Sequence, residues 1–249
     1  MKQNKIWILA TIAIILVLVV SLYFYFHSKP SEFINESELI KVINTQYYDA
    51  DVLDSVEIQE VVFLGETHVF VPFVSNDNYG TSYWVWRNRS WELGGINTIQ
   101  QPYVWKVEPE DPSTYVVVWN IDPEQEMKEF DIYLLNRRGY SVSNDVHHYT
   151  PRVQLNVTVS FETKENSYGV MSLPDEWKTF LDSYVKVEQS KQPDSFMFDF
   201  IHPSNVYFAW MPYDERGELS IPVSPNGAGR GYGEIHLENL STIPEYELE

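Results

Sequence analysis

The feature that most constrains this chain is an uninterrupted apolar segment at residues 6–26. It contains no charged side chain, and only Thr11 and Ser21 are mildly polar. A helix of 21 residues is roughly 30 Å long at about 1.5 Å per residue, which matches the hydrocarbon core of a bilayer. The segment predicts a single transmembrane helix. It is less typical of a buried helix in a soluble protein, because no side of it is polar.

The charges that flank this segment predict its orientation. Lys2 and Lys5 precede it, whereas Glu32, Glu36 and Glu38 follow it. Positive charges are retained on the cytoplasmic side of a membrane. We therefore expect a cytoplasmic tail over residues 1–5, an anchor over 6–26, and an extracytoplasmic remainder of a single-pass protein of the cell membrane.

A cleaved signal peptide is the main alternative to a signal anchor. Its apolar core spans about 7–15 residues and ends at a small-x-small site. Here the apolar run is longer, and Tyr23, Phe24, Tyr25 and Phe26 stand where small residues would be needed. Aromatic side chains at this position instead suit the outer membrane interface. The pattern favours a retained anchor.

Charge and cysteine content narrow the classes of partner and site. The first 30 residues hold three of the 17 Lys and Arg and none of the 36 Asp and Glu, so the remainder has a formal charge of −22. Such acidity argues against nucleic acid, which is bound by clustered Lys and Arg. Zero cysteines exclude disulfides and thiolate metal sites. A cysteine-free exported domain is typical of a bacterial cell envelope rather than of an animal cell surface.

The rest of the chain predicts a short helical stalk and then a β-rich domain. Residues 27–50 carry a ragged apolar stripe, which favours a juxtamembrane helix. Residues 51–249 consist mainly of short runs rich in Val, Tyr, Trp and Phe between turn residues, which is typical of strands. We expect strands near residues 56–64, 68–74, 82–87, 103–107, 115–121, 131–136, 152–161, 196–201, 206–211, 218–223 and 233–237.

One helix is expected within this series, over Pro174–Gln189. Ser172 and Asp175 have the spacing of a capping box, and apolar residues from Trp177 to Val185 recur on one helical face. The fold class predicted is α+β and mainly antiparallel β, sandwich-like or a mixed sheet with one packed amphipathic helix. If the domain is divided, the polar stretch 141–151 is the expected boundary.

An aromatic cluster is the candidate ligand-binding site. Tyr83, Trp84, Trp86, Arg87 and Trp91 lie within nine residues of the chain. Alternation along a strand places Trp84 and Trp86 on one face, where paired rings could stack on sugars or on an apolar patch of a partner. Core packing explains the cluster equally well and is the favoured interpretation, because large apolar side chains are generally buried.

Other motifs are too incomplete to predict catalytic, metal or cofactor sites. Glu66 with His68, and His147 with His148, have the spacing of partial zinc sites, but no second half accompanies them. The glycines between Asn226 and Gly233 lack the Lys-Ser/Thr ending of a phosphate loop. We therefore expect no metal and no cofactor.

Two functions are compatible with these patterns. The first is a membrane-anchored extracytoplasmic binding or structural module, without enzymatic activity, that contacts an envelope protein or polysaccharide. The second is an anchored glycan hydrolase that uses two carboxylates about 5 to 10 Å apart. No pair of carboxylates is singled out by spacing, so the first reading is favoured.

Overall fold

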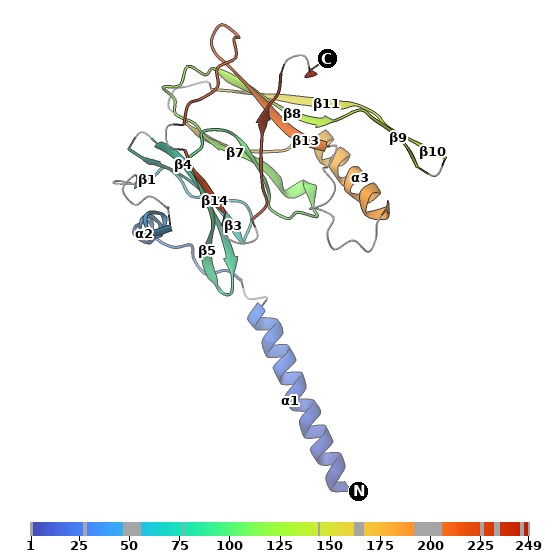
Figure 1. Ribbon diagram of the computed structural model, residues 1–249. Helices are drawn as coiled ribbons and strands as arrows, with labels where there is room; N and C mark the ends of the chain where they lie inside the picture. The colour runs from blue at the N-terminus through green and yellow to red at the C-terminus, as the bar shows by residue number, and fades with distance from the viewer. Residues whose placement is uncertain are drawn as a thin grey trace.

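The computed structural model describes residues 2–26, 29–46, 56–76, 78–143, 145–161, 167–191, 206–224, 227–231, 235–244 and 247–248. Within these ranges the chain forms three α-helices and sixteen strands (Figure 1). The strand pairs are antiparallel apart from β13 and β16. The fold is therefore α+β and sheet-rich, as the sequence predicts.

The first sheet is built from the N-terminal half of the domain. Its order is β1-β3-β4-β5-β14, with β2 pairing with β3 at the side. These strands are β1 (Val56–Ile58), β2 (Val62–Phe63), β3 (His68–Ser75), β4 (Asn78–Arg87), β5 (Ser90–Asn97) and β14 (Gly229–Gly231).

Two further sheets of four strands follow. The second has the order β12-β7-β6-β15 and the third β11-β8-β13-β16. The second contains β12 (Tyr168–Ser172), β7 (Tyr115–Asn120), β6 (Tyr103–Lys106) and β15 (Leu237–Asn239), and a 3₁₀ turn, η1 (Pro112–Thr114), precedes β7. The third contains β11 (Val153–Ser160), β8 (Glu129–Asn136), β13 (Val206–Tyr213) and β16 (Ser241–Thr242).

The second sheet lies between the first and the third. Side chains alternate across a strand, so β7 presents Val116 and Val118 to the first sheet and Val117 and Trp119 to the third. All six residues of β7 are buried. This burial on both faces explains why the strand reads as a continuous apolar run rather than an alternating one.

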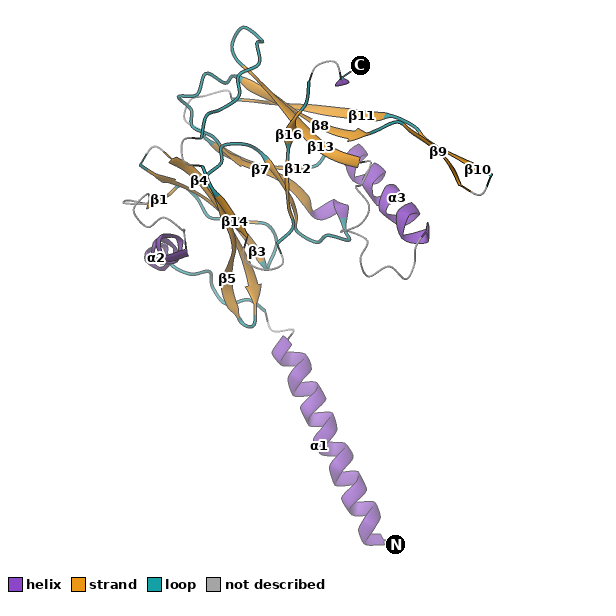
Figure 2. Ribbon diagram, in the orientation of Figure 1, coloured by secondary structure: helices purple, strands orange, loops and turns teal. Residues whose placement is uncertain are grey.

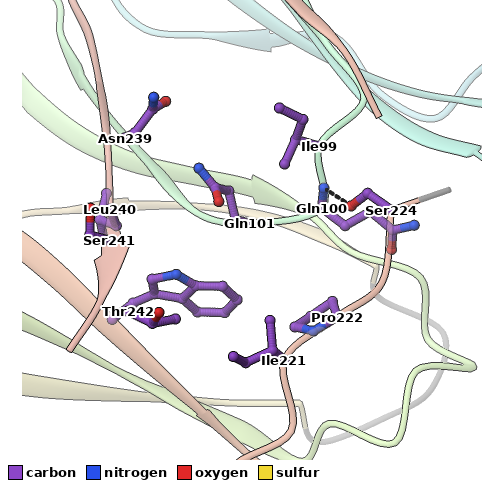
Figure 3. A pocket seen from close by; sticks show the side chains of 11 residues that line it. Ile99, Gln100, Gln101, Ile221, Pro222, Ser224, Asn239, Leu240, Ser241 and Thr242 are labelled. Carbon is purple, nitrogen blue, oxygen red and sulfur yellow. Dashed lines mark hydrogen bonds between the residues drawn. The ribbon is translucent and has the colours of Figure 1, made fainter. Parts of the chain in front are cut away.

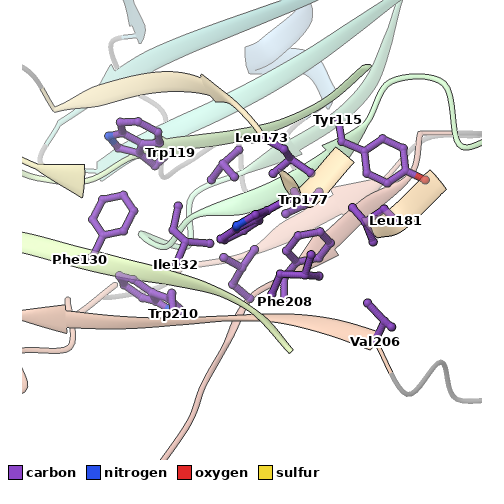
Figure 4. Close-up of a cluster of buried hydrophobic side chains, with 14 of the residues drawn as sticks. Tyr115, Trp119, Phe130, Ile132, Leu173, Trp177, Leu181, Val206, Phe208 and Trp210 are labelled. Carbon is purple, nitrogen blue, oxygen red and sulfur yellow. The ribbon is translucent and has the colours of Figure 1, made fainter. Parts of the chain in front are cut away.

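The third sheet and helix α3 (Asp175–Lys191) enclose the largest apolar core. Trp177 and Leu181 of α3 pack with Ile132, Leu173 and Phe208, as Figure 4 shows. The Trp177 and Phe208 rings lie 6.3 Å apart. The helix expected over Pro174–Gln189 is confirmed, with a start one residue later and an end two residues later.

Helix α2 (Glu36–Gln46) covers the outer face of the first sheet (Figure 2). Leu39 and Ile43 are 1% and 0% exposed and pack with Val69, Val71 and Phe73. The stalk predicted over residues 27–50 therefore differs from what is found: its helical part belongs to the domain core. The apolar spacing of this helix can be read from the sequence, but the sheet on which the helix packs cannot.

The stretch 141–151 lies in a β-hairpin and not in a linker between subdomains. Strands β9 (Gly139–Ser143) and β10 (Val146–Thr150) pair with each other and continue the hairpin formed by β8 and β11. In Figure 1 this hairpin projects away from the sheets. Exposed Tyr140, Val142 and Tyr149 are spaced along it. Its polar composition reflects exposure rather than a domain boundary.

Several strand predictions need correction. The run expected over 56–64 is divided into β1 and β2, and 218–223 forms no strand beyond a bridge from Leu219 to Tyr213. Strands β5 and β12 escaped prediction because each contains glycine, which usually weakens a strand. The strand expected over 196–201 lies outside the described residues, and β15 begins only where the predicted 233–237 ends.

Glycine in β12 is required by a ring on the neighbouring strand. Gly169 pairs with Trp119, and a Cβ at Gly169 would lie 2.1 Å from an atom of that indole. We expect Gly169→Ala to lower the free energy of unfolding by about 2 kcal/mol, because the buried indole must shift. Urea denaturation measures this loss. Gly231→Ala, where nothing lies within 4 Å, is the control; equal losses in the two variants would contradict the explanation.

Helix α1 (Lys2–Phe26) extends away from the sheets in Figure 1. Its described side chains include Ile12, Leu16 and Val20, which are 55%, 64% and 45% exposed. Within the described residues, no helix has the length and apolarity of a membrane span. In α1 the side chains described are those of Trp7, residues 11–21 and Tyr23.

Candidate functional site

The structure buries two of the five predicted binding residues. Tyr83 and Trp84 are 0% and 1% exposed, and they point into the cores on opposite faces of the first sheet. The Trp84 indole donates to Ser82 Oγ at 3.0 Å. Any exposed aromatic platform in this region therefore excludes both side chains.

Trp86, Arg87 and Trp91 are half-buried near the turn that joins β4 to β5. The two indoles pack edge to face with centroids 5.5 Å apart. Arg87 lies 3.3 Å from Glu92 in an ion pair. Ligand binding by these three residues stays a prediction. Of Trp84 and Trp86, which were expected on one exposed face, only Trp86 reaches the surface.

The incomplete histidine motifs do not form metal sites in the part of the chain that is described. No group of three or more His, Asp or Glu side chains is placed to hold an ion there. His147 is exposed, and its Nδ1 lies 2.5 Å from the Tyr140 hydroxyl. His68 lies against Trp105 with ring centroids 5.5 Å apart.

Burial of His68 makes stability depend on pH. Desolvation lowers the pKa of this imidazole below its ordinary 6.5, and the charge of Glu108 partly opposes that shift. The unfolded chain then binds more protons than the folded one just below pH 6.5, so the free energy of unfolding falls as the pH falls through this window. We expect His68→Gln to weaken the dependence of the free energy of unfolding on pH. The urea midpoints of the two proteins from pH 7.5 to 5 measure this. Parallel curves for the two proteins would contradict this.

A cavity of about 410 Å³ lies between the edges of the second and third sheets. Four separate segments of the chain line it, and Figure 3 shows Ile221 and Pro222 on the side opposite Asn239. The lining residues are Ile99, Gln100, Gln101, Trp210, Ile221, Pro222, Ser224, Asn239, Leu240, Ser241 and Thr242.

Gln100 holds two walls of this cavity together. Its backbone N–H donates to Ser224 Oγ at 2.7 Å, and its side-chain Oε1 accepts from the Asp122 N–H at 2.7 Å. Its Nε2 also reaches the Val223 carbonyl at 3.5 Å. Gln100 is 3% exposed, so these bonds fix the 221–224 segment from inside the protein.

The opposite wall offers polar groups to solvent. Asn239, Ser241 and Thr242 are exposed, and among the described residues no hydrogen bond of their side chains is found. Amide and hydroxyl groups both donate and accept hydrogen bonds. Trp210, which is 2% exposed, and Ile221 add apolar surface. The cavity therefore combines a few free polar groups with apolar walls, as small-molecule sites do.

Among the described residues that line the cavity, none has a charged or titratable side chain. Its neighbour Glu238 forms an ion pair with Lys106 at 2.9 Å. Burial raises the pKa of Tyr103, which pairs with Asn239 across the strands, to about 12, so this phenol remains neutral under ordinary conditions. The described amides and hydroxyls of the lining can form hydrogen bonds with the hydroxyl groups of a ligand.

No family model, no curated protein and no solved structure matches this chain. The candidate site therefore depends on its geometry and chemistry alone. Sequence reasoning did not find it, because residues 99–101, 210, 221–224 and 239–242 are brought together only by the packing of two sheets. The local signal was the pair Gln100 and Gln101, which precedes Pro102 and β6.

Proposed function

We propose that this protein is a membrane-tethered extracytoplasmic binding module of a bacterial cell envelope. We also propose that its cavity takes a neutral, hydroxyl-rich ligand, with a segment of envelope polysaccharide as the expected class. The observation that carries this proposal is that the described residues of the lining contribute amides, hydroxyls and apolar side chains but no charge. Sugar hydroxyls pair with such groups, and sugar ring faces contact apolar walls.

The tether is supported by residues 6–26 of the sequence. These 21 residues carry no charge, and α1 continues as one helix to Phe26. The apolar side chains described in α1 are exposed, which is costly in water and favourable in lipid. Lys2 and Lys5 on one side and the acidic domain on the other favour an extracytoplasmic domain.

A hydrolase is not supported by this cavity. Glycoside hydrolysis generally needs two carboxyl groups on either side of the scissile bond. Among the described lining residues there is none. The binding role therefore agrees better with the chemistry of the site.

Binding of oligosaccharides to the full chain in detergent tests the proposal. We expect neutral oligosaccharides to bind more tightly than matched ones that carry uronic acids, measured by isothermal titration calorimetry. Asn239→Ala and Thr242→Val should each weaken neutral binding about three- to tenfold, which corresponds to one lost hydrogen bond.

The matched control is Asn156→Ala, because Asn156 is an exposed strand asparagine on β11, outside the cavity lining. It should leave affinity unchanged. Tighter binding of the acidic oligosaccharides, or equal affinity in all three variants, would contradict the assignment of the cavity.

A further inference from the structure

We propose that the end of the first sheet nearest α1 rests on the lipid headgroups of the membrane that α1 spans. This surface, termed the interfacial tip, consists of Phe63, Trp86, Trp91 and the turn 87–90 between β4 and β5. The inference rests on the proposed membrane tether and adds a second contact with the same bilayer.

Chain length places the tip close to the membrane. Helix α1 ends at Phe26, and the Trp91 indole N–H donates to the Ser31 carbonyl at 3.2 Å. Five residues span at most about 18 Å, so the Ser31 backbone lies within this distance of the end of α1, and the Trp91 indole nitrogen lies 3.2 Å from the Ser31 carbonyl oxygen. Figure 1 shows the lower ends of β3 and β5 as the part of the sheets nearest α1.

Aromatic packing fixes the linker to the tip. The Phe33 ring packs edge to face against Phe63, Trp84 and Trp91, with centroids 5.9, 5.8 and 5.0 Å away. Phe33 also belongs to the periphery of the core beneath α2. Because the linker is held against the sheet two residues after Ser31, the domain cannot turn this end away from the membrane without breaking these contacts.

The composition of the tip suits a headgroup layer. Phe63 is 56% exposed, and Trp86 and Trp91 are half-buried. Phe63 and Trp91 both pack against Phe33, and Trp86 packs against Trp91. Amphipathic rings gather at membrane interfaces because one end is apolar and the other forms hydrogen bonds. Pro30, Phe33, Phe63 and Trp91 also line an apolar hollow. Contact with the headgroup region of the membrane would cover this apolar surface, which is otherwise exposed to water.

The charges around the tip predict little preference for anionic lipid. The cations Lys29, Arg87 and Arg89 are matched in number by the anions Glu32, Glu66 and Glu92. Polybasic segments are the ones that select anionic lipid, at about 1 kcal/mol per cation. The tip should therefore contact zwitterionic and anionic membranes to a similar extent.

Site-specific labelling of the full chain in lipid nanodiscs tests the inference. The chain has no cysteine, so one introduced cysteine carries one fluorophore. Phe63→Cys and Ser90→Cys place the fluorophore on the tip, and Val142→Cys places it on the exposed β9–β10 hairpin away from α1. Leu16→Cys reports on α1 itself. Quenching is measured with lipids that carry a nitroxide on the headgroup or on the acyl chain.

We expect the headgroup nitroxide to quench both tip fluorophores at least threefold more than the one at residue 142, in zwitterionic and anionic nanodiscs alike. The acyl-chain nitroxide should quench the fluorophore at residue 16. Quenching at residue 16 with none at 63 and 90 would overturn the tip contact and leave the tether intact. No quenching at residue 16 would overturn the tether, and the tip contact with it.

Discussion

Replacing Asn120 with alanine is expected to lower the free energy of unfolding by about 3–4 kcal/mol. Asn120 is 2% exposed at the end of β7, and its amide Nδ2 lies 2.7 to 3.0 Å from Gln59 Oε1, the Phe73 carbonyl and the Gly80 carbonyl. Its Oδ1 accepts from Ser167 Oγ at 2.8 Å. Alanine leaves buried partners unsatisfied, at about 1–3 kcal/mol for each group that finds no replacement.

This residue joins two sheets, since Phe73 and Gly80 belong to the first and Asn120 to the second. Urea denaturation followed by tryptophan fluorescence gives the loss of stability. The control is again the exposed Asn156→Ala, which is expected to change stability by less than about 0.5 kcal/mol. A similar small change in Asn120→Ala would show that the polar junction does not stabilise the packing of the sheets.

Replacing Trp105 with alanine is expected to cost about 4 kcal/mol. Trp105 of β6 is 1% exposed, and its ring lies edge to face with Tyr83, with centroids 5.2 Å apart. It fills the layer between the second and first sheets together with Phe70 and Tyr103. Removing an indole from such a layer loses its burial and leaves a cavity, and large-to-alanine changes of this kind typically cost 3–5 kcal/mol.

Trp86→Ala is the matched control, because this tryptophan lies near the end of β4 and is only half-buried. Its cost should be less than half that of Trp105→Ala in the same denaturation experiment. If the two variants lost equal stability, the apolar layer between the first and second sheets would not be a main source of stability.

The parts of the fold that the sequence predicted share one property: their apolar side chains form either a continuous run or a helical period within one short segment. The runs at 68–74, 103–107, 115–121 and 131–136 all form strands within two residues of the expected bounds. The helix α3 shows the three- and four-residue spacing of a single buried face. Such patterns depend on neighbours in the chain, so the sequence alone reveals them.

Other parts depend on partners that are distant in sequence. Gly94 and Gly95 lie in β5 beneath Ile235, about 140 residues later in the chain, so their role is invisible locally. The same holds for the cavity, whose polar wall comes from β15 and β16 and whose other wall comes from 221–224. The aromatic run at 83–91 shows a further limit, because strong β-propensity predicts a strand but does not tell which of its rings are buried.

The tether is the claim on which the proposed role and the tip contact both depend. Labelling of single cysteines with a membrane-impermeant maleimide tests it most directly, because the natural chain has none. Glu215→Cys lies on an exposed turn of the domain, and Gln3→Cys lies before the apolar segment. We predict labelling at residue 215 in intact spheroplasts, and at residue 3 only after lysis. Labelling at residue 215 that appears only after lysis would contradict the account.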